Sequence, residues 1–422
     1  MIDAIRWSKK IALGAAVSLA CTTMSAEAAD SDASWKQFHG PNGDNISGET
    51  GLLKTWPEGG PKLIWTTAGF GHGFSSVVVA DGRVITAGNI EGETIITAVD
   101  LNGKELWKVK NGEGWNSKPA YPGTRGTPTI DGDFVYHENP HGNVICLEAA
   151  TGKTVWEVNV LKKYNGENIR WALSESIIID GDNVIATPQG PEVSFVALNK
   201  KTGEIVWEAA STGDAAGYAT PIIFEHSGLR IITNLTSKSL IGVNADNGDV
   251  LWRVDHPSYT DQNTAMPIFR DGHVFVSTIK GDAVKWKVIV DGGKASLDEI
   301  WRTDQLENHH GGLVLLGDNV YGTSISRNRN KWVTLDWETG EVKQVTDAVG
   351  KASMTVADGL IYMLSIDRLM GIAQPSDSGI ELISSFEIPE GGDGKSWAHP
   401  VVVGGRMYLR HSDFLYVYDI SE

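Results

Sequence analysis

Short apolar runs of strand length recur eight times along this chain of 422 residues, and each run opens at a turn rich in Asp and Gly. Successive turns lie 41 to 50 residues apart, beginning at residues 81, 131, 180, 227, 271, 317, 358 and 404. An Asp-Gly pair adopts the positive φ angles of a tight hairpin, so the flanking runs predict antiparallel strands. Each period holds about four such strands, which is typical of a propeller blade.

The units close on a second signature, Gly-x-x-x-Trp, after the outermost hairpin. Four copies are complete, a fifth keeps only its Trp, and a sixth has lost the Trp at residues 340–344. Because indole is large and carries one polar N–H, we expect these rings to fill the seams between blades, with the N–H hydrogen-bonded. The predicted structural tryptophans are Trp65, Trp107, Trp156, Trp207, Trp252 and Trp301.

The two ends of the chain complement each other. The last unit, residues 400–419, has room for three strands and no Trp, whereas residues 61–67 form an orphan closing strand that carries Trp65. Joined, they complete an eighth blade and remove the exposed edges of an open array. The sequence therefore predicts an all-β, eight-bladed β-propeller of four-stranded antiparallel blades, closed by the N-terminal strand and forming one domain at 29–422.

The repeat resembles a known family. The pattern Ala-x-Asp-x-x-Thr-Gly-x-x-x-Trp, present as residues 98–107 and in later copies, is similar to the PQQ-like repeat of quinoprotein alcohol dehydrogenases and of BamB-like envelope proteins. The start of the chain, residues 35–41 and 51–57, also resembles many secreted bacterial members. This resemblance implies the propeller fold, but it does not settle the function.

The N-terminus predicts export. Three basic residues precede an apolar stretch at 11–20, and Ala-Glu-Ala at 26–28 supplies a signal-peptidase site. We therefore expect residues 1–28 to be a Sec signal peptide and the mature protein to be periplasmic or secreted, with lipidation at Cys21 as the alternative. No later run approaches the ~20 apolar residues that a membrane span requires.

The net charge and the cysteine content exclude some partners and covalent links. The formal net charge is −17, and removal of 1–28, which holds three positive and two negative residues, makes it −18. An acidic exported protein is a poor partner for nucleic acid. Only Cys146 would remain after processing, which leaves no intrachain disulfide. We expect a monomer.

Candidate site residues lie just upstream of each opening hairpin, because these loops meet at the mouth of the axial channel of a propeller. The segments are 71–75, 125–127, 170–175, 217–220, 262–266, 308–311, 351–354 and 397–399. Together they are richer in polar and aromatic residues than a structural pore requires. The predicted ligand-binding residues are His72, Arg125, Trp171, Glu175, Tyr218, Asn263, His309, His310, Trp397 and His399.

Two further features bear on the site. His309 and His310 could share a metal ion only in a loop, with His72 or His399 as a third ligand, and no zinc-type spacing supports such a site, so no metal is predicted. Trp115 lies in a turn-rich insertion at 111–124 and is a candidate rim aromatic. The alternative for all these residues is a purely structural role, in which they cap blade edges and satisfy buried backbone groups.

Function remains open between two classes. The first is a binding module that takes a small molecule, a glycan or an envelope protein at the channel mouth. The second, implied by the resemblance, is a PQQ-dependent alcohol dehydrogenase with a Ca or lanthanide ion, for which Glu175 and Asn263 could be ion ligands and Trp171 or Trp397 a stacking floor. The adjacent cysteines and the catalytic Asp motif of those enzymes are absent, which favours the binding module. A hydrolase or lyase acting through His309 and His399 has no supporting motif.

Overall fold

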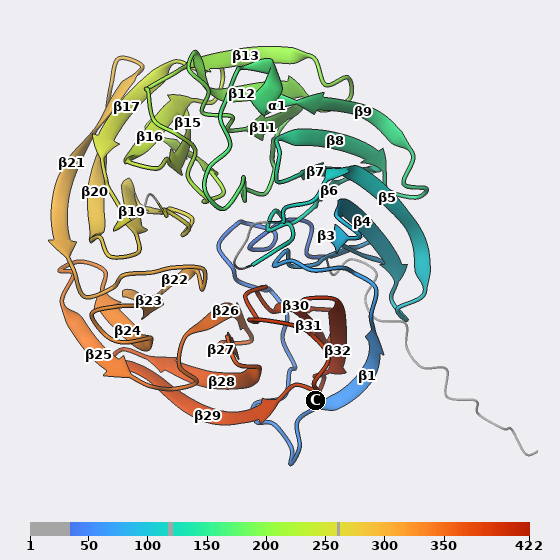
Figure 1. Ribbon diagram of the computed structural model, residues 1–422. Coiled ribbons are helices and arrows are strands. Elements are labelled where there is room, and N and C mark those ends of the chain that lie inside the picture. Colours follow the sequence, from blue (N-terminus) through green and yellow to red (C-terminus); the bar gives the residue numbers. More distant parts are fainter. Residues whose placement is uncertain (1–33, 117–120, 260–261) are drawn as a thin grey trace, which may run out of the picture.

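A computed structural model describes residues 34–116, 121–259 and 262–422. These residues form eight four-stranded antiparallel sheets arranged around one axis (Figure 1). The predicted eight-bladed propeller is therefore confirmed. The predicted signal peptide and Cys21 lie outside the described residues.

The first four blades follow the chain from the inner strand outward. Their strands are β2 (Val78–Ala80), β3 (Arg83–Ile90), β4 (Glu93–Asp100) and β5 (Glu105–Glu113); β6 (Thr129–Asp131), β7 (Phe134–Glu138), β8 (Asn143–Glu148) and β9 (Thr154–Asn159); β10 (Ile178–Asp180), β11 (Asn183–Ala186), β12 (Val193–Asn199) and β13 (Ile205–Ala210); and β14 (Ile222–His226), β15 (Leu229–Leu235), β16 (Ser239–Asn244) and β17 (Val250–Asp255). A short helix, α1 (Val160–Lys163), follows β9.

The remaining blades repeat the same order. Their strands are β18 (Ile268–Arg270), β19 (His273–Ser277), β20 (Ala283–Asp291) and β21 (Lys294–Thr303); β22 (Leu313–Leu316), β23 (Asn319–Ser324), β24 (Lys331–Asp336) and β25 (Val342–Thr346); β26 (Ala352–Ala357), β27 (Leu360–Ser365), β28 (Leu369–Ser376) and β29 (Gly379–Glu387); and β30 (Val401–Val403), β31 (Arg406–His411), β32 (Phe414–Asp419) and β1 (Lys62–Thr67). β1 pairs antiparallel with β32, so the N-terminal strand closes the ring as predicted.

The Gly-x-x-x-Trp signature joins each blade to the next. The Trp107 indole Nε1 donates to the Ala149 carbonyl at 3.0 Å, and the Trp207 Nε1 donates to the Ala245 carbonyl at 3.0 Å, both in the following blade. The same bond runs from Trp65, Trp156 and Trp301 to Leu101, Lys200 and Trp337. Five of the six predicted tryptophans therefore lie in the seams with their N–H groups satisfied, and the prediction of a hydrogen-bonded N–H is wrong for Trp252.

The glycine of the signature serves the same seam. At Gly152 a Cβ atom would lie 2.8 Å from the ring of Trp107, and at Gly203 it would lie 2.8 Å from the ring of Trp156. Both glycines also have φ near +72°, which side-chain-bearing residues rarely adopt. The glycine and the tryptophan of the repeat therefore contact each other across the seam, because the glycine of one blade makes room for the indole of the blade before it.

Three seams depart from this rule. In β29 the position of the Trp is taken by Ser384, which pairs with Ile372 as Trp107 pairs with Ala98. The Trp252 Nε1 has no acceptor among the described residues, and in the next blade β20 and β21 continue as a paired ladder to a turn at 291–294. Where the sixth unit has lost its Trp, Gln344 donates to the Ile380 carbonyl at 3.1 Å and accepts from the Ile380 N–H at 2.8 Å. An amide therefore replaces the indole in that seam.

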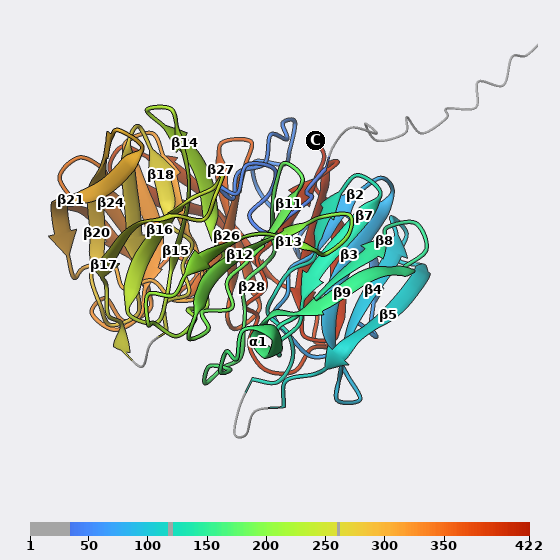
Figure 2. The ribbon, with the colours of Figure 1, turned by 90° about the horizontal axis from the view of Figure 1, so that it is seen from above.

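The segment at 34–60 crosses one end of the ring before it enters β1. Trp35 pairs with Val79 of β2, and Ile46 pairs with Val356 of β26, so this segment bridges distant blades. Figure 2 shows it on one face of the ring, with α1 and the loop after α1 on the opposite face. The axial channel is therefore covered at one end by the chain itself.

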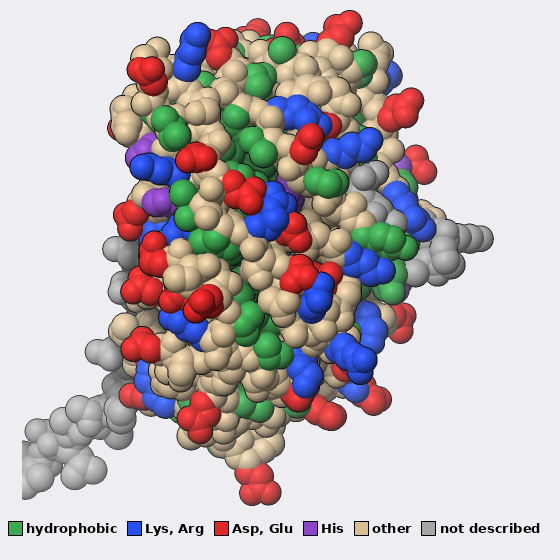
Figure 3. Space-filling model, turned by 90° about the vertical axis from the view of Figure 1, so that its left-hand side faces the viewer, with side chains coloured by type: hydrophobic (Ala, Val, Ile, Leu, Met, Phe, Trp, Pro, Cys, Tyr) green, Lys and Arg blue, Asp and Glu red, His purple; other side chains and the backbone are tan. Residues whose placement is uncertain are grey.

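The outer wall carries mixed charge. Figure 3 shows acidic and basic side chains interspersed over the side of the ring that holds β21, with no large area of one sign. Arg302 of β21, for example, donates to Glu299 and to Asp282. Among the described residues, no helix has the length and apolar character needed to cross a membrane.

Candidate functional site

A cavity of about 350 Å³ lies on the axis of the ring. Its walls come from the loops that lead into the first strand of all eight blades, together with Phe38 of the N-terminal segment. The lining residues are Phe38, Phe74, Tyr121, Arg125, Trp171, Ser174, Ser176, Tyr218, Thr220, Gln262, Thr264, His309, His310, Ile325, Lys351, Trp397 and His399. This set has no carboxylate, although the chain as a whole has a net charge of −17.

Aromatic rings form one wall around Trp397. Its ring centroid lies 4.6 Å from that of Phe74 and 4.8 Å from that of Tyr121. His310 stacks on Trp397 at 4.8 Å with an interplanar angle of 26°. The Trp397 indole Nε1 is buried and has no acceptor among the described residues, like the Trp252 Nε1 and unlike the other five seam indoles. This wall offers aromatic rings to the cavity.

Lys351 supplies a buried positive charge. Its side chain is 9% exposed, and its Nζ lies 2.8 Å from the Nδ1 of His309, which is its one hydrogen-bond partner among the described residues. No carboxylate of the described chain lies within ion-pairing distance of it. Burial, with the nearby charge of Lys395, lowers the pKa of Lys351 to about 8. An ammonium has three N–H donors, so two remain for other acceptors.

Arg125 brings a second cation, from the loop before β6. Its Nη1 and Nη2 donate to the carbonyls of Gly123 at 3.1 Å and Tyr121 at 2.9 Å. The guanidinium carbon lies 5.3 Å from the centroid of the Phe74 ring, a cation–π distance. Burial lowers the pKa of Arg125 to about 10. At neutral pH both cavity cations are therefore charged, and neither has a carboxylate partner in the part of the chain that the structure describes.

The histidines of this region are held neutral. Burial lowers the pKa of His399 to about 4 and that of His309 to about 3. The His399 Nε2 lies 2.9 Å from the carbonyl of His310, so this nitrogen carries the proton, and Nδ1 faces the Asn45 amide at 3.4 Å. Burial also lowers the pKa of His310, and the neighbouring charge of Lys351 lowers it further. The lysine and arginine thus carry the charge of the site.

Seven of the ten predicted ligand-binding residues line this cavity: Arg125, Trp171, Tyr218, His309, His310, Trp397 and His399. Two others point away from it, although their neighbours line it. Glu175 lies between Ser174 and Ser176, and Asn263 lies between Gln262 and Thr264. Side chains alternate in extended backbone, so one residue of each triplet faces the blades when the other two face the axis.

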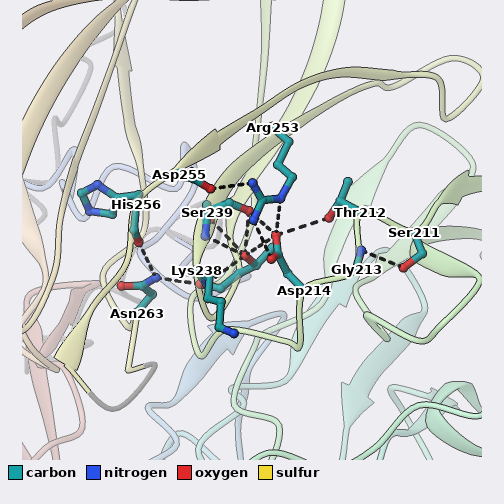
Figure 4. A network of polar contacts seen from close by, with 11 residues as sticks. Ser211, Thr212, Gly213, Asp214, Lys238, Ser239, Arg253, Asp255, His256 and Asn263 are labelled. Atoms are coloured by element: carbon teal, nitrogen blue, oxygen red, sulfur yellow. Dashed lines mark hydrogen bonds and ion pairs between the residues drawn. The ribbon is translucent and has the colours of Figure 1, made fainter.

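Glu175 and Asn263 have structural partners. The Thr187 N–H donates to Glu175 at 2.7 Å, and Glu138 lies beside Glu175 as a second buried carboxyl group. Burial raises the pKa of both groups. The Asn263 amide donates to the Thr236 carbonyl at 2.7 Å, next to the buried Asp214 and Arg253 network (Figure 4).

His72 and Trp115 also lie outside the cavity lining. His72 is exposed, and its Nδ1 lies 3.0 Å from the Ser412 hydroxyl. Trp115 is half-buried against His141, with ring centroids 5.7 Å apart. The Trp115 ring therefore belongs to a contact on the loop rather than to the axial wall.

Several cavity residues were not among the predicted ones. Lys351, Phe74, Gln262 and Thr220 belong to the predicted loop segments, but nothing in their local sequence separates them from ordinary polar or packing residues. Phe38 comes from a segment whose path across the axis depends on contacts with distant blades. Tyr121 lies in the 111–124 insertion, so the insertion does reach the cavity, through a residue other than Trp115.

The residues present do not fit an ion beside a quinone. Calcium and lanthanide ions prefer carboxylate and carbonyl oxygens, and the described cavity lining offers two cations and four histidines or amides instead of acids. Glu175 and Asn263, the predicted ion ligands, are engaged elsewhere, and no cluster of three or more His, Cys, Asp or Glu among the described residues could hold a metal. Cys146 is buried in β8, far from any cysteine neighbour in sequence.

The eight blades, the Gly-x-x-x-Trp seam and the axial cavity define a β-propeller of the PQQ-like repeat class. Within that class, the family described as Outer membrane protein assembly factor BamB matches residues 91–346, and the chain belongs to this family.

Individual relatives are distant. Outer membrane protein assembly factor BamB of Shewanella oneidensis is 22% identical over 285 residues, covering 63% of this chain and 67% of the relative, and that of Yersinia pestis is 23% identical over 278 residues, covering 62% and 66%. The match thus spans about two thirds of the length of these relatives. Among solved structures, BamB of Moraxella catarrhalis has a TM-score of 0.59 at 16% identity, covering 85% of this chain and 98% of its own.

A second type of protein shares the fold. The structure of the quinohemoprotein alcohol dehydrogenase of Comamonas testosteroni has a TM-score of 0.63 at 11% identity and covers 92% of this chain and 81% of its own. At this identity the likeness shows the fold alone. Both the BamB-like and the dehydrogenase-like resemblances are therefore confirmed at the level of the superfamily.

Proposed function

We propose that this protein is a binding module that takes a small ring-bearing molecule, free or as part of a glycan, in its axial cavity. The aromatic wall around Trp397 carries this proposal, because ring faces exposed to a cavity bury a flat apolar surface of a ligand. A volume of about 350 Å³ lies in the range of small-molecule sites. Export to the cell envelope fits both the basic and apolar N-terminus and the name of the BamB relatives.

A calorimetric titration with 4-nitrophenyl β-D-glucoside, which joins a sugar ring to an aromatic ring, tests the proposal. We expect saturable binding that Trp397→Ala abolishes, because the truncation removes the stacking surface. Trp207→Phe is the matched control, since Trp207 lies in a seam far from the cavity lining, and it should bind like the wild type. Binding unchanged in Trp397→Ala would overturn the proposal.

The dehydrogenase alternative can be tested with the same protein. The donor set of the cavity argues against a quinone held beside Ca or a lanthanide ion, so we expect no dye-linked alcohol oxidation after PQQ and either ion are added. Oxidation that depends on both additions would favour the enzyme over the binding module.

A further inference from the structure

The cavity has an excess of hydrogen-bond donors. Lys351 uses one of its three N–H groups on His309, which leaves two N–H groups without an acceptor among the described residues. Buried charges in proteins are normally paired, and buried donors are normally satisfied. The walls offer hydroxyl and amide groups at Ser174, Thr264 and Gln262, but the described lining has no carboxylate.

Elsewhere in this ring, a buried charge finds its partner inside the chain. Asp214 accepts two hydrogen bonds from Arg253, at 2.8 and 2.9 Å, and another from Ser239 at 2.5 Å (Figure 4). Lys285, 1% exposed, donates to the carbonyl of Trp337 at 3.0 Å and pairs with Glu338 at 3.2 Å. Lys351 is also buried, but the described chain supplies no acid for it.

We propose that the ligand of the axial cavity is an organic anion, a ring compound whose carboxylate or sulfate group is held by Lys351 beside the aromatic wall. This inference rests on the proposed function and names the chemical class of its ligand. An oxyanion accepts several N–H bonds at once, so it completes the donors that the protein leaves open. Arg125, whose guanidinium lies over Phe74, adds positive charge on the neighbouring wall.

The geometry also explains why an acidic protein can bind an anion. The net charge of −17 repels anions at long range, but exposed charges are screened beyond about 10 Å at 0.1 M salt. Among the described residues that line the cavity, the charged ones are Lys351 and Arg125. Arg170, whose guanidinium carbon lies 5.2 Å from the ring centroid of Trp171, extends the positive character toward the loop after α1.

Two probes that differ by one group test the inference. 4-Nitrophenyl β-D-glucuronide carries a carboxylate where 4-nitrophenyl β-D-glucoside carries a hydroxymethyl group. We expect the wild type to bind the glucuronide about 10- to 100-fold more tightly than the glucoside, since hydrogen bonds to charged groups are worth that factor. Lys351→Gln should remove this preference, so that the ratio of the two affinities in the variant falls to about one, because the group that distinguishes the carboxylate is gone.

The outcomes separate the two proposals. Equal affinity for both probes, or a preference for the glucuronide that survives in Lys351→Gln, would overturn the anion assignment and leave the proposed function standing. Binding of neither probe at millimolar concentration would overturn both. If Lys351→Gln fails to fold, Lys351→Arg provides the second test: it keeps the charge and should keep at least part of the preference.

Discussion

Tryptophan occupies two regions of this ring under opposite conditions. In the seams, Trp107, Trp156 and Trp207 are packed between blades and each donates its N–H to a carbonyl of the next blade. At the axis, Trp397 presents its ring to a cavity, and its N–H has no acceptor in the described chain. Tryptophan therefore stabilises the ring in the seams, whereas at the axis its ring lines a cavity that a ligand can enter.

This difference separates structure from function within a repeat protein. The N–H groups of five seam tryptophans find acceptors in the next blade, with Trp252 as the exception, whereas two N–H groups of the cavity residue Lys351 have no acceptor in the described chain. The charged residues show the same difference. Asp214 and Lys285 are paired with opposite charges, whereas Lys351 has no such partner in the described chain. A buried cation without an acid in the described chain, on the wall of a cavity, therefore marks the site.

Truncation of the two kinds of tryptophan should give the largest contrast. We expect Trp207→Ala to lower the free energy of unfolding by roughly 3–5 kcal/mol, because a packed indole is lost from a seam. Trp397→Ala should cost less than about 2 kcal/mol, since Trp397 is partly exposed and already borders a cavity. Urea unfolding of both variants measures the difference, and equal losses would contradict the distinction between seam and cavity.

Lowering the pH should reduce the stability of the protein through the cavity histidine His399 rather than through the seam tryptophans, which do not titrate. The pKa of His399 falls from 6.5 to about 4 on burial, which corresponds to about 3 kcal/mol of preference for the neutral form. The folded pKa is the lower one, so this stability is present above pH 6.5 and is lost as the pH falls from 6.5 toward 4.

Unfolding in urea between about pH 7 and about pH 4.5 should therefore show a steep loss of stability. His399→Gln should flatten part of that slope, whereas Trp207→Phe should shift the curve without changing the slope. A slope that is identical in wild type and His399→Gln would contradict the neutral assignment of this histidine.

Removal of the cavity lysine should stabilise the protein. The folded pKa of Lys351 is about 8, against 10.5 for a lysine side chain in water, so at neutral pH the folded state carries a charge that its surroundings disfavour. We expect Lys351→Met, which keeps the apolar stem, to raise the free energy of unfolding by roughly 1–3 kcal/mol. Lys285→Met is the matched comparison: it breaks a buried ion pair and should destabilise. A loss of stability in Lys351→Met would show that the lysine is structural.

The smallest effect lies within the seams. Trp207→Phe removes a satisfied N–H and leaves the Ala245 carbonyl without its donor, so it should cost about 1 kcal/mol more than Trp252→Phe. Trp252 donates to no acceptor in the described chain. Thermal unfolding of the two variants checks this, and equal losses would mean that the seam hydrogen bond contributes nothing measurable.

Much of the fold could be predicted from the sequence because each blade repeats the same local chemistry. Hairpin glycines and the seam Trp recur at fixed spacing, and the orphan strand at Trp65 required a partner. The irregular seams were harder to predict: the loss of Trp at Gln344 was visible, but its replacement by a bidentate amide depends on the position of Ile380 in the next blade.

The sequence was enough to predict which loops form the site, but not which of their side chains line it. The loops before the first strands do converge on one cavity, but which side chain of each loop faces the axis depends on local alternation, which placed Glu175 and Asn263 toward the blades. Lys351 became notable only when its surroundings showed that it lacks an acid, a property of contacts rather than of sequence. Phe38 reaches the axis because its segment pairs with blades far away in sequence, as Ile46 does with Val356.

The most direct test follows the indole N–H groups themselves. In a ¹H–¹⁵N spectrum of tryptophan-labelled protein, with the Trp397 and Trp207 signals assigned from Trp397→Phe and Trp207→Phe, saturating 4-nitrophenyl β-D-glucuronide should move the Trp397 signal and leave the Trp207 signal in place. A Trp397 signal that stays fixed at saturation would contradict the assignment of the axial cavity as the binding site.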